Sequence, residues 1–115
     1  NEIIPILKKN GFIIVDFDKI SFDKQLDYVL NSNIIISVHG AALTHMLWMK
    51  RKSKILEIRA RDNCNDNCYF SLASDLEHNY FYVIADKTNV NKSDHFSDLK
   101  VDPNNFLNEL EKIIR

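Results

Sequence analysis

The stretch NIIISVHGAALTHMLWM, residues 33–49, decides the fold predicted for this chain. Its first part, Ile34 to Val38, is an apolar and mostly β-branched run, which is typical of a strand buried on both faces. A corner at His39 and Gly40 follows, and the residues from Ala41 to about Lys50 are compatible with a helix. The sequence therefore predicts a strand that enters a helix through a glycine-containing turn.

This corner has the chemistry of an anion site. The first N–H groups of a helix have no partner within the helix, and the helix dipole adds roughly half a positive charge there. Gly40 permits backbone angles that other residues resist, while Ala41 and Ala42 keep the side chains beside it small. We expect the corner to bind the diphosphate of a nucleotide-sugar. An ordinary strand-to-helix connection is the alternative, because one glycine is weaker than a full dinucleotide-binding motif.

Strands and helices alternate along the rest of the chain. Apolar runs predict further strands at residues 12–15, 54–58 and 80–85, and helical spacing predicts helices at residues 2–9, 22–30, 69–78 and 103–114. Continuous apolar strands indicate a sheet covered by helices on both faces. The sequence therefore predicts one three-layer α/β/α domain over residues 1–115, with a mostly parallel sheet of four or five strands.

Ligands of such sheets bind outside the carboxyl ends of the strands. His39 follows one strand and could donate a hydrogen bond to a diphosphate, or it could cap the strand end. Glu57 lies near the end of the strand at residues 54–58 and could accept hydrogen bonds from ribose hydroxyls, or it could form a surface ion pair with Arg59. Thr44 falls in the first turn of the corner helix, where it could contact a phosphate, cap or pack.

The bulk composition excludes several classes of protein. A chain of 115 residues with 45% apolar residues suits one compact domain, and a formal net charge of -1 gives no electrostatic reason to expect nucleic acid as a partner. No apolar run approaches the ~20 residues needed to cross a bilayer. The chain begins at Asn1 without an initiator methionine, which suggests a fragment, a processed chain or an excised domain.

The two cysteines and three of the histidines are candidate metal ligands. Cys64 and Cys68 could form half of a metal site with His78, a local disulfide, or two free thiols in a polar loop. The two thiols are favoured, and the disulfide ranks ahead of the metal site because four soft ligands at zinc spacing are absent from the sequence. His45, His78 and His95 show no metal spacing and are expected at the surface. We expect neither a metal nor a cofactor.

Several short motifs match a known family in order and spacing. They are Asn1 and Glu2, Gly11 and Phe12, Ser21, Phe22 and Gln25, the HGAALT segment at residues 39–44, and Leu56, Glu57 and Ile58. With these residues the chain resembles glycosyltransferase family 61, which includes capsular-polysaccharide enzymes, plant xylosyltransferases and animal protein O-linked N-acetylglucosamine transferases. The HGAAL segment is the most specific of the motifs.

The resemblance implies a GT-B architecture, in which the C-terminal one of two Rossmann-like domains holds the donor. It implies an inverting transfer from a nucleotide-sugar to a glycan or protein acceptor, in polysaccharide or glycan biosynthesis, without an obligatory metal. The residues implied at the donor diphosphate are His39, Gly40, Ala41, Ala42, Leu43 and Thr44, and Glu57 is implied at the ribose. It assigns no catalytic residue, and we expect a cytoplasmic location, either free or at the inner face of a membrane.

The chain also departs from the family pattern. Arg51 and Lys52 stand where the family often has Pro-Gly, and His45 stands where it often has Asn. The family's strand with a Ser-Arg pair, upstream of Asn1, is not within these residues, and neither is the acceptor domain. We therefore expect a gap or a changed strand order in the sheet, and little or no transferase activity from this chain alone.

Two other functions stay open at this point. One is a flavodoxin-like interaction module without a ligand, which would form an oligomer through an exposed sheet edge. The other is a redox or metal protein that uses Cys64 and Cys68.

Overall fold

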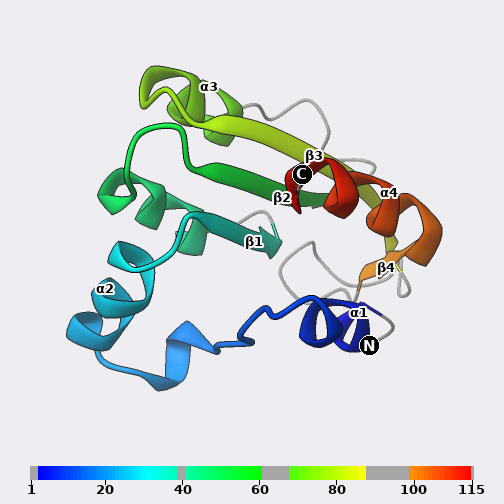
Figure 1. Cartoon of the computed structure of the whole chain (residues 1–115), viewed down its shortest axis with the longest axis horizontal. Helices are drawn as coiled ribbons and strands as arrows, with labels where there is room; N and C mark the ends of the chain where they lie inside the picture. Colours follow the sequence, from blue (N-terminus) through cyan, green and yellow to red (C-terminus); the bar gives the residue numbers. More distant parts are fainter. Residues whose placement is uncertain (1–2, 39–40, 61–67, 88–98, 115) are drawn as a thin grey trace.

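The computed structural model describes residues 3–38, 41–60, 68–87 and 99–114 (Figure 1). Its elements, with η for a 3-10 helix, are α1 (Ile4–Lys9), η1 (Phe17–Lys19), α2 (Phe22–Leu30), β1 (Ile34–Val38), η2 (Ala41–Trp48), β2 (Lys54–Ala60), α3 (Cys68–Asp75), β3 (Asn79–Lys87), β4 (Leu99–Val101) and α4 (Pro103–Ile114). The predicted helices are all present within the described residues. No described helix has the length and apolar character needed to cross a membrane.

The four strands form one curled sheet in the order β1-β2-β3-β4 (Figure 1). β1, β2 and β3 are parallel, whereas β4 pairs antiparallel with β3. The predicted mostly parallel sheet is therefore confirmed, with four strands. β4 was not predicted, because its three residues, Leu-Lys-Val, are too short a run to stand out at the end of a polar stretch. In the register, Ser37 of β1 lies opposite Glu57 of β2, and Glu57 lies opposite Tyr82 of β3.

Successive residues of β2 pack into two different cores. Leu56 and Ile58 belong to a cluster that includes, from α1 and α4, Leu7, Phe106, Leu110 and Ile113. Ile55 belongs to a second cluster that includes, from α2, η2 and α3, Val29, Leu43, Met46 and Ala73. Because neighbouring strand residues point to opposite faces, helices bury apolar side chains on both faces of β2. This burial explains why the strand is a continuous apolar run.

The helix after the corner is wound as a 3-10 helix. η2 has eight residues, which is long for this type, and the predicted helix to about Lys50 ends instead at Trp48. Leu43 and Met46, together with Met49 just beyond the helix, are buried and spaced three residues apart. A 3-10 helix has three residues per turn, so this spacing puts all three side chains on one face, against β2. The side-chain spacing thus favours the tighter winding.

Local signals at the helix ends match the structure. The Ser21 hydroxyl accepts a hydrogen bond from the N–H of Lys24 at 3.3 Å, as expected of an N-cap. Asp102 likewise accepts from the N–H of Asn104 at 2.9 Å, directly before the proline that begins α4. α1 ends before Gly11, whose φ of +85° lies in the left-handed region that glycine adopts easily.

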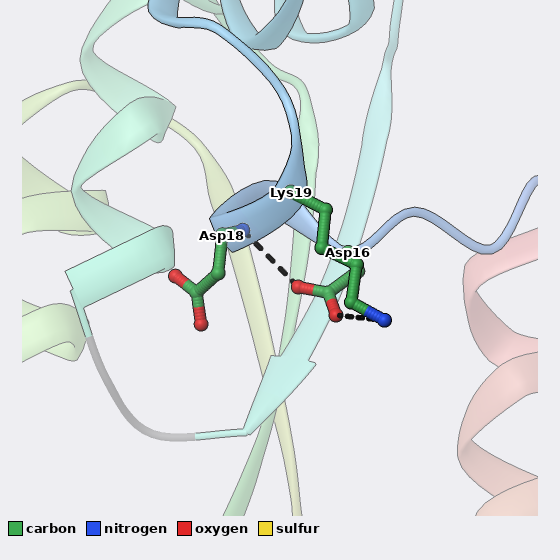
Figure 2. Close-up of polar contacts among 3 residues, drawn as sticks. All are labelled: Asp16, Asp18 and Lys19. Carbon is green, nitrogen blue, oxygen red and sulfur yellow. Dashed lines mark hydrogen bonds and ion pairs between the residues drawn. The ribbon is translucent and has the colours of Figure 1, made fainter.

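The strand predicted at residues 12–15 is wrong. These residues form no strand, and Ile13 and Ile14 are 73% and 45% exposed. Among the described residues β1 pairs with β2 only, and a cavity of about 770 Å³ is lined both by residues 12–18 and by the whole of β1. The segment is apolar enough for a strand, but it pairs with no strand in the part of the chain that the structure describes. It ends at Asp16, whose carboxylate accepts from the N–H of Asp18 at 3.1 Å and lies 3.8 Å from the Lys19 ammonium (Figure 2).

Candidate functional site

The predicted diphosphate corner joins β1 to η2. His39 and Gly40 lie outside the described residues, so this part of the prediction concerns residues that the structure does not describe. Beyond the corner, Leu43 is fully buried in the core and Thr44 is exposed. The Leu43 side chain therefore packs inward, and only its backbone is left for a ligand. The expected contact of residues 39–44 with a diphosphate stays a prediction.

Glu57, the predicted ribose ligand, is 0% exposed. Its carboxylate accepts a hydrogen bond from the hydroxyl of Tyr80 on β3. Arg59, two residues further along β2 and on the same face, is also buried, and its guanidinium hydrogen-bonds the Tyr80 hydroxyl. The alternative prediction, a surface ion pair between Glu57 and Arg59, is therefore wrong, because both residues are buried. Burying a carboxylate is costly unless donors and positive charge compensate it, and Tyr80 and Arg59 supply both.

The same three residues fix the protonation of Tyr80. Burial, followed by the hydrogen bond to Glu57 and its negative charge, raises the pKa of Tyr80 far above 10.0, while Arg59 opposes this shift. The phenol therefore stays protonated at physiological pH and keeps donating to Glu57. Sequence reasoning missed this role of Tyr80, because the contact joins residues 23 positions apart.

Aromatic side chains extend from this cluster along one face of β3. The ring centroids of Tyr80 and Phe70 of α3 are 5.3 Å apart, edge to face, and those of Tyr80 and Tyr82 are 6.3 Å apart in a stacked arrangement. Phe70 and Tyr82 are 48% and 53% exposed. The sequence held a sign of this row, because Tyr80 and Tyr82 are two residues apart in a strand and so share a face.

Gln25, one of the residues that match the family, connects three elements. Its side-chain amide N–H group donates to the carbonyl of Phe17 at 2.8 Å, and its side-chain oxygen lies 2.9 Å from Nε2 of His45. Because that oxygen accepts, Nε2 of His45 carries the proton. The His45 ring also lies edge-on to Phe17, with centroids 5.0 Å apart. Gln25 thus holds η1 and η2 against α2, and the half-buried His45 is not the surface residue that was predicted.

The remaining candidate ligands do not form a metal site among the described residues. His78 is buried rather than exposed as predicted, and its Nε2 donates to the carbonyl of Met46 at 2.9 Å. Cys68 is exposed at the first residue of α3, while Cys64 and His95 lie outside the described residues. Within the described part of the chain, no three His, Cys, Asp or Glu residues are grouped so that they could hold a metal ion.

The described residues define a mixed α/β protein with a mostly parallel sheet and a buried polar cluster on one face of it. Comparison with known proteins shows a similarity to one family over the N-terminal part of the chain. Residues 1–56, which contain β1, η2 and the first residues of β2, match the family model Glycosyltransferase 61. The resemblance to glycosyltransferase family 61 that the sequence predicted is thus confirmed over these residues.

The chain is also similar to proteins described as EGF domain-specific O-linked N-acetylglucosamine transferase. The protein of Drosophila melanogaster is 40% identical over 60 residues, which cover 51% of this chain and 11% of that protein. The protein of Gallus gallus is 35% identical over 79 residues, covering 64% of this chain and 14% of that protein. This chain therefore spans only a small part, 11% to 14%, of the length of these relatives.

Proposed function

We propose that this chain is the donor-binding domain of an inverting glycosyltransferase that uses a nucleotide-sugar. The single observation that carries the proposal is the family match over residues 1–56, because this range contains the whole HGAALT segment at the end of β1. The carboxyl ends of parallel strands are where α/β sheets bind nucleotides, and that segment follows such an end.

In this proposal residues 39–44 bind the donor diphosphate, chiefly through backbone N–H groups at the start of η2. Glu57 lies one strand away, directly opposite Ser37, where the ribose follows the diphosphate of a bound nucleotide. Its carboxylate is buried and bonded to Tyr80, so a ribose contact requires the Tyr80 side chain to turn aside. The Glu57 carboxylate then accepts a hydrogen bond from a ribose hydroxyl in place of the one from the Tyr80 hydroxyl.

The rest of the enzyme is part of the same proposal. A GT-B enzyme needs a second domain for the glycan or protein acceptor, and this chain supplies the three-layer, Rossmann-like donor half. The cavity between residues 12–18 and β1 is lined by apolar side chains and by a strand edge, and we propose that a further strand of the sheet occupies it. The proposed transfer needs no metal ion, belongs to polysaccharide or glycan biosynthesis, and takes place in the cytoplasm or at the inner face of a membrane.

A titration tests the donor site. Calorimetry of the chain with UDP, GDP, CDP and TDP should show binding of at least one nucleotide, and His39→Ala and Glu57→Gln should each weaken it about tenfold, as expected for one lost polar contact. Glu111→Gln is the matched control, because Glu111 is an exposed carboxylate on α4. Folded protein that binds none of the four nucleotides would refute the proposal.

A non-catalytic, flavodoxin-like interaction module is the second candidate. The exposed Ile13 and Ile14, beside a strand edge that has no described partner, favour it. It predicts a concentration-dependent oligomer in sedimentation velocity and no response to nucleotide, whereas the donor domain responds to nucleotide whatever its oligomeric state.

A further inference from the structure

Three side chains lie in one row across the parallel part of the sheet. Ser37 of β1, Glu57 of β2 and Tyr82 of β3 are directly opposite one another, and residues in register on neighbouring strands share a face. This is the face covered by η2 and α3, because Ile55 and Tyr80 on it pack against both. Neighbouring strands are about 4.8 Å apart, so the row extends roughly 10 Å from β1 to β3.

The β3 end of this row presents an open aromatic ring. Tyr82 is 53% exposed, and the stacked Tyr80 holds it from one side at a centroid distance of 6.3 Å. Tyr80 in turn is fixed by its hydrogen bond to Glu57 and its edge contact with Phe70. Tyr82 is therefore an exposed aromatic ring beside a buried polar cluster.

We infer that Tyr82 is the stacking surface for the base of the donor nucleotide, an inference that rests on the function proposed above. The order of groups in a nucleotide-sugar indicates that the base, and not the donor sugar, lies at Tyr82. The ribose lies between the base and the diphosphate, and the donor sugar lies beyond the diphosphate. With the diphosphate at the end of β1 and the ribose at Glu57 of β2, continuing across the sheet to β3 leads to the base.

Stacking on Tyr82 would increase the affinity for the nucleotide without selecting one base over another. Every nucleobase has a π-face, and stacking one on an aromatic side chain contributes about 1–3 kcal/mol by alanine substitution, which is roughly 5- to 150-fold in affinity. The ring supplies this contribution, so phenylalanine at the same position should serve as well as tyrosine.

Two variants and two probes test the inference. The probes are the best-binding nucleoside diphosphate, found among UDP, GDP, CDP and TDP, and inorganic pyrophosphate, which has no base. Tyr82→Ala should weaken nucleotide binding at least fivefold and leave pyrophosphate binding within twofold of the unmodified chain. Tyr82→Phe should leave both within twofold. In NMR spectra of the unmodified chain, the nucleotide should shift the Tyr82 ring resonances upfield, whereas pyrophosphate should not.

The outcomes separate this inference from the function on which it rests. If nucleotide binds and Tyr82→Ala has no effect, or weakens pyrophosphate equally, the base does not stack on Tyr82 while the donor site stands. If the folded chain binds no nucleotide, both the donor site and the stacking surface are refuted. Circular dichroism of each variant confirms that the comparison is made on folded protein.

Discussion

Removal of one hydroxyl group, in Tyr80→Phe, should destabilise the chain measurably. The Tyr80 hydroxyl is a donor to a carboxylate that is 0% exposed, and the substitution keeps the ring that packs against Phe70 and Tyr82. After the change Glu57 has lost a donor and stays in a site that water does not reach. The effect therefore isolates the hydrogen bond from the packing of the aromatic row.

The size of the loss follows from the kind of bond. A hydrogen bond to a charged group contributes about 1.5–3 kcal/mol. Tyr80 itself is only half-buried and the positive charge of Arg59 remains beside the cluster, so we expect the lower part of this range, about 1.5–2 kcal/mol. For a domain of this size, this corresponds to a fall in Tm of roughly 5–10 °C. With a urea m-value of about 1.5 kcal/mol/M, the midpoint should move by about 1 M.

Urea unfolding at pH 7, followed by far-UV circular dichroism, measures this change. Tyr82→Phe is the matched control, because it removes the same group from an exposed ring on the same strand face and should change the free energy of unfolding by less than about 0.5 kcal/mol. In a Glu57→Gln background the effect of Tyr80→Phe should shrink, since the charge that strengthens the bond is gone. Equal effects of the two tyrosine variants would show that the Glu57 carboxylate does not depend on Tyr80.

Two further predictions concern the pH dependence of stability and the core beside α4. Because the pKa of Tyr80 is raised above 10.0, folded protein holds a proton that unfolded protein loses, so stability should fall as pH rises above about 10; the fall should be smaller in Tyr80→Phe, and parallel melting curves would contradict this. Phe106→Ala, in a fully buried position of α4, should cost about 3–5 kcal/mol in urea unfolding, against less than about 1 kcal/mol for Leu107→Ala at an exposed position.

The strands show what the sequence can and cannot predict. β2 is an apolar run that helices bury on both faces, and β1 is an apolar run that is partly buried on both faces, so the pattern alone identified them. Residues 12–15 carry the same pattern and form no strand, because hydrogen bonding in a sheet depends on a neighbour that local sequence does not specify. The sequence therefore indicates which segments are suited to a strand, and the partner decides which of them become one.

The candidate site divides in the same way. The strand that contains Glu57 followed from the chain order, but β2 runs on to Ala60, so Glu57 is its middle residue and not near its end as predicted. The burial of Glu57 did not follow from the chain order, because the donor comes from Tyr80 on the next strand. His78 gives a second example. It was expected at the surface, but it is buried and its ring N–H donates a hydrogen bond to the carbonyl of Met46 in η2, 32 residues away. Such contacts between distant residues are set by the packing of elements and have no counterpart in residue spacing.

The winding of η2 determines how far the corner reaches. A 3-10 helix rises about 2.0 Å per residue and an α-helix about 1.5 Å, so rewinding its eight residues as an α-helix would shorten the segment by about 4 Å. Since Leu43, Met46 and Met49 are buried in the core, most of that shortening would displace Ala41, the first residue of η2. The three-residue spacing of these apolar side chains thus sets the distance between the core and the first residue of η2.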